Sequence, residues 1–425
     1  MSSRILIYSY VFILVLIINE TVLFGGGTVL DEVLLLFSFL LLVFYSVRDG
    51  IVFGKSRKAY IVILLFFAYS VFLFLWSPYS ASFSYMFAQT AIVLKPFILM
   101  VIILRLFNPI DRKLISLSKI IKVQIYFVLF CVILNIIFRS SWNEILGVRE
   151  NYRYGLLQLI GIFNGPGNLG DFLIMLVIVF IGSRDYRSNH EWLIANVKKI
   201  LKFFSLALLL VLIFVGVRKP IFMTIPLIYY LYKYGIFRNQ KKYVIQFGLA
   251  FVILGVIIGT NTNIIGLTTS NLSNFSNSES SYIRGLMFFH GVSLFITHFP
   301  FGVSAATFGS NLSVINTMSV YEATDLASTK YLSGEDAFGI FDSGFASFLA
   351  EFGFIGILIY CLFLKYFFKM LDDEYQVSLQ VKMLTIYILI ASIFSPGVFN
   401  GITSAIYCLF LVYRRNEEIP KWKNK

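Results

Sequence analysis

Charged side chains are scarce in this chain. Only 13% of its 425 residues are Asp, Glu, Lys or Arg, whereas a soluble globular protein carries about 25%. Hydrophobic residues make up 58% of the sequence, and the mean hydropathy is +0.83. The composition therefore excludes an ordinary soluble domain and predicts an integral membrane protein.

Cysteine and histidine are also rare, with three of each. Cys131, Cys361 and Cys408 all lie in apolar runs, which indicates small buried side chains rather than a disulfide framework or a metal site. The sequence has no P-loop, no G-x-G-x-x-G and no exposed D-x-D motif for a metal–nucleotide sugar. We therefore expect no metal, no cofactor and no nucleotide-dependent reaction.

Apolar runs long enough to cross a bilayer, which takes about 20 residues, recur along the chain. They lie near 5–24, 28–47, 59–76, 83–104, 119–138, 157–182, 201–217, 220–236, 244–260, 345–368, 381–395 and 398–413. The sequence thus predicts an all-α polytopic membrane protein with about twelve transmembrane helices and one large external loop carrying short amphipathic helices. No small-residue cleavage signal follows the first run, so we expect a retained span rather than a removed signal peptide.

One long polar interruption divides the apolar runs. We expect the first part of the transmembrane bundle at 1–259, the large periplasmic or external loop at 260–344, and the rest of the bundle with a short cytoplasmic tail at 345–425. Within the loop, 282–298 has the pattern of an amphipathic helix.

The net charge of +13 could suggest a nucleic-acid partner, but the basic residues gather in alternate short loops between the spans. The positive-inside rule then predicts that both termini are cytoplasmic and that the large loop is external. The basic residues that do not follow this rule are Lys95, Arg139, Arg149, Arg153, Arg218, Lys219, Arg284 and Lys330.

Three of these cations are candidates for binding phosphate, because a guanidinium group offers two parallel donors to an oxyanion. Arg218 lies between two spans with almost no loop, Arg284 begins the 282–298 helix, and Arg153 precedes a glycine-rich turn at 161–168. The alternative is that these side chains reach the lipid headgroups without a functional role.

Candidates for proton transfer lie in and just after the large loop. His290 and His298 are eight residues apart and so lie on roughly one face of the predicted helix. Asp342 precedes the span near 345–368, and Glu351 lies in its first turns. Each group could act as a general acid or base. The alternatives are a structural hydrogen bond for each histidine and a helix N-cap for Asp342.

Several short segments between about residues 155 and 360 form an ordered set of motifs. They are Gly161-Ile162-Phe163-Asn164 with Asn168, Gly216-Val217-Arg218-Lys219, Arg284 with Gly291, His298-Phe299-Pro300-Phe301-Gly302-Val303 with Phe308, Phe341-Asp342-Ser343-Gly344, and Leu349-Ala350-Glu351-Phe352-Gly353-Phe354-Ile355-Gly356. This order resembles the motif blocks of the O-antigen polymerase and O-antigen ligase superfamily.

The resemblance implies a metal-independent, inverting glycosyltransferase of the bacterial plasma (inner) membrane. Such enzymes use sugars linked to undecaprenyl pyrophosphate on the outer face of that membrane. By motif, Arg218 and Arg284 would neutralise the departing pyrophosphate, with Arg153 as a further candidate. The ligase branch has a histidine where this chain has Asp342, which favours the polymerase branch. The general base then stays open among Asp342, His298 and His290.

The sequence leads us to expect an O-antigen-type polysaccharide polymerase of lipopolysaccharide biosynthesis, which joins a lipid-linked glycan to a lipid-linked repeat unit. The alternatives are the O-antigen ligase and, from another class, a flippase or transporter of lipid-linked oligosaccharides. A transporter favours short external loops and polar residues at mid-membrane, whereas here only Lys95 lies deep in a span. Expected partners are lipid-linked glycans, membrane lipid and a chain-length regulator protein, with no nucleic acid.

Overall fold

The computed structural model describes part of the chain. The described residues are 3–19, 30, 33–37, 40, 57–106, 117–150, 152–153, 156–182, 283–328, 332, 344–375, 383, 386–387, 389 and 391. The spans predicted near 201–217, 220–236, 244–260 and 398–413, and the predicted C-terminal cytoplasmic tail, lie outside these residues.

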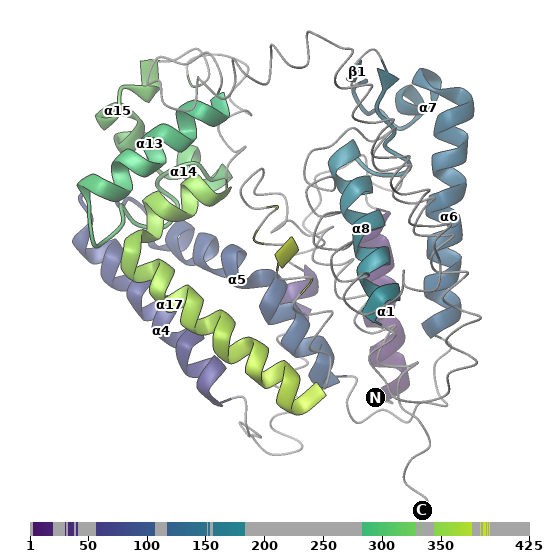
Figure 1. The fold of residues 1–425 in the computed structure, drawn as a ribbon, viewed down its shortest axis with the longest axis horizontal. Helices are drawn as coiled ribbons and strands as arrows, with labels where there is room; N and C mark the ends of the chain where they lie inside the picture. The colour runs from purple at the N-terminus through teal and green to yellow at the C-terminus, as the bar shows by residue number, and fades with distance from the viewer. Residues whose placement is uncertain are drawn as a thin grey trace, which may run out of the picture. The chain divides into compact units, whose positions relative to one another are not determined.

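The chain divides into two compact units (Figure 1). One unit takes in Met1–Ile51, Pro96–Thr260 and Asn400–Lys425, and the other takes in Val52–Lys95 and Asn261–Phe399. The described residues are mostly helical, with one antiparallel pair of short strands and non-helical segments between the helices. The prediction of a helical chain is therefore confirmed at this level for the described part.

In the second unit, two long apolar helices pack against each other and run in opposite directions (Figure 1). Helix α4 spans Arg57–Trp76 and helix α17 spans Gly344–Tyr375. The ammonium group of Lys58 lies 5.8 Å from the ring centroid of Tyr366 at one end of the pair. Further along, the hydroxyl group of Tyr69 donates to the carbonyl oxygen of Phe352 at 2.9 Å.

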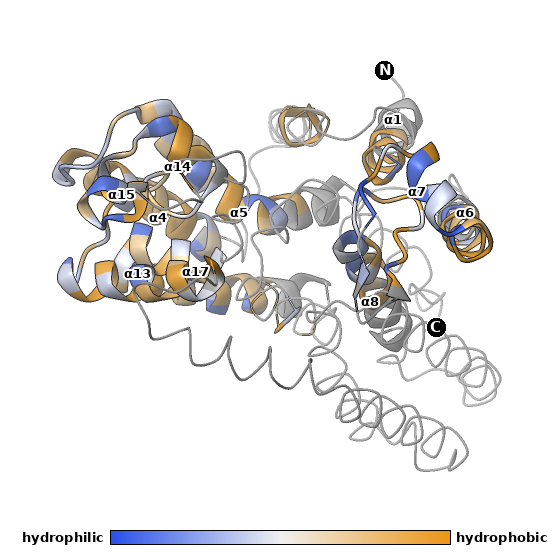
Figure 2. Cartoon of the chain, turned by 90° about the horizontal axis from the view of Figure 1, so that it is seen from above, coloured by the Kyte–Doolittle hydropathy of each residue, from blue (hydrophilic) through white to orange (hydrophobic). Residues whose placement is uncertain are grey.

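Two helices in the described part of the chain, Lys58–Trp76 and Gly344–Met370, are long and apolar enough to cross a membrane. Both match runs that the sequence predicts as spans, near 59–76 and 345–368. Figure 2 shows hydrophobic residues along α4 and α17. The total of about twelve spans stays a prediction, because half of the predicted runs fall wholly or mostly outside the described residues.

The other described apolar helices are close to their predicted positions, with one correction. Helix α1 spans Ser3–Ile18, α5 spans Phe83–Leu106 with Pro96 inside it, and α6 spans Leu117–Phe138. Helix α8, expected from residue 157, begins only at Pro166 and ends at Gly182. Proline is favoured at the first position of a helix because its missing N–H has no intrahelical partner there.

The residues before α8 form a small polar framework in the first unit. Strand β1 (Tyr152–Arg153) pairs antiparallel with β2 (Leu156–Leu157), and the short helix α7 (Ser140–Ile145) follows α6. Buried Asn135 of α6 accepts hydrogen bonds from the backbone N–H groups of Ile160 (2.8 Å) and Gly161 (3.2 Å). It also donates to the side-chain oxygen of Asn143 at 3.0 Å. This amide therefore fixes the turn that precedes α8.

The described part of the predicted external loop folds into four short helices that belong to the second unit. The helix expected at 282–298 is confirmed as α13, Ile283–Thr297. It packs along α17, where a Cβ atom added to Gly291 would lie only 2.9 Å from the carbonyl oxygen of Ala346. After it come α14 (Asn311–Asn316), α15 (Ser319–Ala323) and the 3₁₀ helix η3 (Leu326–Ser328).

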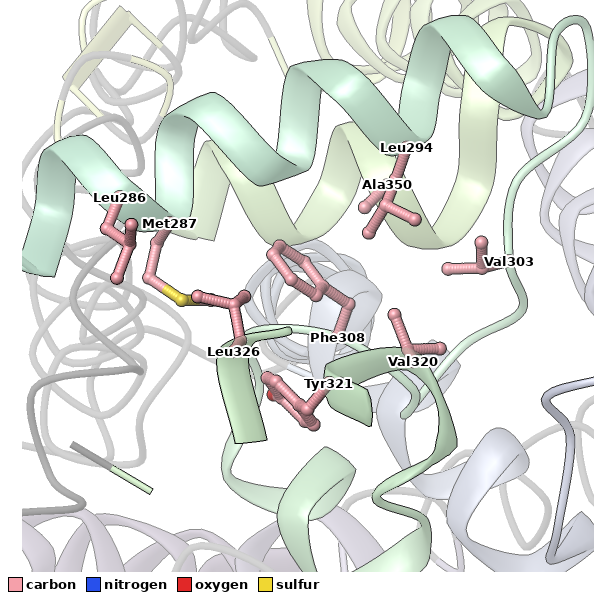
Figure 3. Close-up of a cluster of buried hydrophobic side chains, with 9 residues drawn as sticks. All are labelled: Leu286, Met287, Leu294, Val303, Phe308, Val320, Tyr321, Leu326 and Ala350. Atoms are coloured by element: carbon pink, nitrogen blue, oxygen red, sulfur yellow. The ribbon is translucent and has the colours of Figure 1, made fainter. Parts of the chain in front are cut away.

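These short helices enclose their own apolar core (Figure 3). Its buried members come from α13, from the segment between α13 and α14, from α15, from η3 and from α17. They are Leu286, Met287, Leu294, Val303, Phe308, Val320, Tyr321, Leu326 and Ala350. Burying a Val, Leu, Met or Phe side chain stabilises a fold by about 1.5–3 kcal/mol. The described part of the loop, 283–328, is thus a packed structure built on the first half of α17.

Candidate functional site

The segment between α13 and α14, residues 298–310, docks into a break in helix α17. At Gly353 the backbone leaves the helical conformation, with φ 62° and ψ −165°. The break frees carbonyl groups of the preceding turn. Those of Ala350 and Glu351 accept hydrogen bonds from the backbone N–H groups of Val303 (2.9 Å) and Ser304 (3.1 Å). A break inside an apolar helix is tolerated where neighbouring groups satisfy the freed backbone in this way.

The two backbones meet so closely that both contact points are glycines. A Cβ atom on Gly302 would collide with the backbone of Glu351, and one on Gly353 would collide with the backbone of Phe301. On the far side of the break, the N–H group of Ile355 donates to the carbonyl oxygen of Pro300 at 3.2 Å. The docked segment therefore replaces the hydrogen bonds that α17 loses.

The carboxylate of Glu351 fixes the second half of the docked segment. Its side chain is fully buried. One carboxylate oxygen, Oε1, accepts from the backbone N–H groups of Thr307 (3.1 Å) and Phe308 (3.3 Å) and from the hydroxyl group of Ser310 (3.3 Å). The other, Oε2, accepts from Nε2 of Gln89 at 3.1 Å. With both oxygens engaged and no exposure, Glu351 holds the segment in place and is not presented to a substrate hydroxyl group.

A second polar chain links the end of this segment to α15. The phenol oxygen of Tyr321 accepts from the N–H group of Gly309 at 2.8 Å and lies 2.6 Å from the hydroxyl oxygen of Ser313. Because that hydroxyl group already donates to the carbonyl oxygen of Ser310 at 2.6 Å, Tyr321 is the donor in its pair with Ser313. Burial raises the pKa of Tyr321 to about 12, which keeps the phenol protonated and able to donate.

The docked segment holds two non-glycine residues in the left-handed region. Ser304 has φ 91° and Ala306 has φ 59°, and both are buried. Such conformations cost about 1–3 kcal/mol each and persist only where the surroundings impose them. The hydroxyl oxygen of Ser304 has no hydrogen-bond partner among the described residues. The surroundings that impose this backbone are the break in α17 and the carboxylate of Glu351.

His298 begins this segment at the end of α13. Its Nδ1 atom lies 3.1 Å from the carbonyl oxygen of Leu294 and 3.0 Å from the hydroxyl oxygen of Thr297. The ring meets that of Tyr79 edge to face, with centroids 5.7 Å apart. The side chain is half-buried. His290 lies within α13, also half-buried, with its ring edge to face against that of Phe289.

The remaining residues predicted for the site are described only in part or lie outside the described residues. Arg153 is in β1 and Arg284 is in the first turn of α13, and for both the structure describes the backbone and not the side chain. Arg218 and Asp342 lie outside the described residues. Among the predicted residues, the structure therefore places Arg284, His290 and His298 on or at the end of one helix.

Sequence reasoning missed what organises the site. It named Glu351 as a possible base but did not foresee its acceptor role, nor its partner Gln89, which lies 262 residues away in the chain. Gln89 and Lys95 are buried polar residues within the apolar helix α5. The position of Gln89 inside an apolar run could have identified it, because a polar side chain within a membrane span usually forms a hydrogen bond or an ion pair.

Among the residues that the structure describes, no group of three or more His, Cys, Asp or Glu side chains could hold a metal ion. No protein-family model matches the chain, and neither a curated protein nor a solved structure matches it.

Proposed function

We propose that the chain is an O-antigen-type polysaccharide polymerase. It would transfer a growing glycan from undecaprenyl pyrophosphate onto a lipid-linked repeat unit at the outer face of the bacterial inner membrane. The observation that supports this is the segment 298–310, which the break in α17 and Glu351 hold rigidly beside α13. Residues 302–310 are buried and support residues 298–301, whose half-buried or exposed side chains form a preorganised surface at the end of two apolar helices, where a lipid-linked substrate would arrive.

Charge placement in the second unit supports an outward-facing position for this surface. Lys58, Lys365 and Lys369 are exposed at one end of the antiparallel pair α4 and α17. The exposed ring of Trp76 lies at the other end of α4, close to Phe301 of the docked segment. Lysine favours the cytoplasmic side of a membrane, and tryptophan favours the interfaces. These preferences support the proposal that the docked segment faces outward.

The proposed chemistry needs no nucleotide or metal, because the lipid pyrophosphate is itself the leaving group. Arg284 and Arg218, with Arg153 as a further candidate, would neutralise the charge that develops as the pyrophosphate departs. Arg284 lies in the first turn of α13 and His298 directly follows its last residue, so the cation and a proton acceptor would be positioned by one helix.

The test is a gel of surface glycan from cells that lack the chain, complemented with variants. Cells without it should show glycan of a single repeat unit. Wild-type chain should restore the long ladder. Arg218→Ala and Arg284→Ala should each lower the amount of long-chain product by about 100-fold, as expected when one transition-state charge contact is lost. Arg149→Ala, which removes an exposed arginine on the same predicted side, is the matched control.

Other outcomes identify the alternatives. Polymer that forms but stays on its lipid carrier in the deletion strain would indicate the ligase. Repeat units that never reach the outer face would indicate a flippase. Full-length ladders from Arg218→Ala and Arg284→Ala would show that these cations are not the pyrophosphate clamp.

A further inference from the structure

The last turn of α13 determines which nitrogen of His298 carries the proton. The backbone N–H group of His298 donates to the carbonyl oxygen of Leu294 at 3.0 Å, so the residue continues the helical turn. The same carbonyl oxygen lies 3.1 Å from ring atom Nδ1. A carbonyl oxygen can only accept, so Nδ1 carries the hydrogen in the neutral ring. Its other neighbour, the hydroxyl oxygen of Thr297, can accept as well, because that group donates its own proton to a backbone carbonyl oxygen.

The other ring nitrogen, Nε2, is left with a lone pair. No described residue is a hydrogen-bond partner of Nε2, and the side chain is half-exposed. A neutral imidazole whose Nδ1–H is held by a carbonyl group presents Nε2 as a base of defined direction. Of the titratable side chains in the described part, that of Tyr79 packs against this ring. His290, in contrast, lies inside α13 and already interacts with neighbouring groups.

Contacts before and after His298 in the chain also hold its backbone and ring in place. Before it, the turn of α13 holds Nδ1. After His298, the carbonyl oxygen of Pro300 accepts a hydrogen bond from the N–H group of Ile355 in α17. Further along, the N–H group of Val303 donates to the carbonyl oxygen of Ala350, and the carbonyl oxygen of Val303 accepts from the hydroxyl group of Ser77 at 2.6 Å. A catalytic group needs this kind of support, because a small displacement of a reacting atom lowers the rate strongly.

We propose that Nε2 of His298 is the general base of the transfer reaction, a role that rests on the proposed polymerase function. The hydroxyl oxygen of the acceptor sugar attacks the anomeric carbon of the donor, and a carbon–oxygen bond forms. The bond from that carbon to the pyrophosphate oxygen breaks, and its electron pair leaves with the lipid pyrophosphate. The hydroxyl proton moves to Nε2, and the resulting imidazolium later releases it to water. The Nδ1–H group stays hydrogen-bonded to the carbonyl oxygen of Leu294 throughout.

The test uses the full chain in lipid nanodiscs and lipid-linked repeat units extracted from cells that lack the chain. His298→Asn is the decisive variant, because its amide can still donate to Leu294 where Nδ1 did, but it has no Nε2. We expect kcat to fall by about 100-fold or more with KM changed less than about twofold, since binding contacts remain. The limb of the pH–rate profile that reports the base should disappear. Ser293→Ala, one turn earlier in α13, is the matched control.

A second variant separates chemistry from structure. His298→Ala leaves space for free imidazole, and added imidazole should restore a measurable fraction of the rate, whereas it should restore nothing to Arg284→Ala. Equal kcat for His298→Asn and wild type would overturn the role of His298 and leave the polymerase function standing. Loss of the pH-dependent limb in Asp342→Asn, together with its retention in His298→Asn, would also overturn the role of His298 and leave the polymerase function standing. Absence of polymer from the wild-type chain would overturn both proposals.

Discussion

Gln89 and Glu351 are joined by a hydrogen bond of 3.1 Å from the amide Nε2 to the carboxylate Oε2, although 262 residues separate them in the chain. The same carboxylate accepts from Thr307, Phe308 and Ser310 through its other oxygen. Glu351 therefore connects α5, α17 and the docked segment at one point. A group with several buried partners is costly to remove, because each donor left without an acceptor costs about 1–3 kcal/mol.

The first prediction concerns this pair. Glu351→Leu leaves the three donors of the docked segment without an acceptor and should lower the melting temperature in detergent by roughly 5–10 °C. Glu351→Gln should be tolerated, because its amide oxygen can still accept from Thr307 and Phe308 while Gln89 turns its own amide to accept from the new N–H group. Gln89→Glu should be harmful, because it sets two carboxyl groups against each other. Thermal unfolding followed by size-exclusion chromatography measures all three.

The double variant Gln89→Glu/Glu351→Gln is the matched control. It exchanges the carboxylate and the amide but keeps every donor opposite an acceptor, so it should recover most of the stability that Gln89→Glu loses. If the double variant were no more stable than Gln89→Glu, the two side chains would not be partners. If Glu351→Leu had the same melting temperature as the wild type, the carboxylate would not hold the segment.

The second prediction concerns the break in α17. Gly353→Ala places a Cβ atom against the backbone of Phe301 at a residue whose φ is 62°, so it combines a collision with an unfavourable conformation. The backbone angles of Gly353, φ 62° and ψ −165°, lie in a region essentially confined to glycine, and they alone cost about 1–3 kcal/mol for a residue with a Cβ atom. We expect the docked segment to leave the break. Protease cleavage within 298–310 should then become faster, and the glycan ladder should shorten or vanish.

Gly165→Ala serves as its control, because an added Cβ atom there has nothing within 4 Å. That variant should show the wild-type cleavage rate. Protection of the segment in Gly353→Ala equal to that in the wild type would mean that the close approach of the two backbones is unimportant for docking.

Much of the helical framework can be predicted from the sequence, because apolar runs of membrane-spanning length have few alternatives to helix. The ranges 59–76, 83–104 and 119–138 all correspond to helices within a few residues. The predicted start of the helix at residue 157 is wrong because hydrophobicity alone cannot distinguish a buried turn from a helix. There Asn135 accepts hydrogen bonds from the N–H groups of Ile160 and Gly161, and the helix begins only at Pro166.

The docked segment could not be predicted in the same way. Its glycines, Gly302 and Gly353, are visible in the sequence, but nothing local shows that they face each other across about 50 residues. The tautomer of His298 depends on one carbonyl oxygen in a helix end whose position was known only to within a turn. Pairings between distant backbone groups follow from packing, which periodicity and composition do not encode.

The last prediction concerns an amide pair that links α1 and α6 in the first unit. Asn19, just after α1, and Gln124 of α6 exchange two hydrogen bonds of 3.2 Å, and both side chains are buried. In an apolar setting, Asn19→Leu or Gln124→Leu leaves the other amide without this partner, whereas Asn19→Leu/Gln124→Leu removes both polar groups. Hydrogen bonds between membrane helices contribute about 0.6 kcal/mol on average and up to about 1.7 kcal/mol. The double variant should therefore be more stable than the sum of the single losses predicts, by an interaction free energy in this range. Unfolding in detergent–denaturant mixtures measures the cycle, and strictly additive losses would show that the two amides do not stabilise each other.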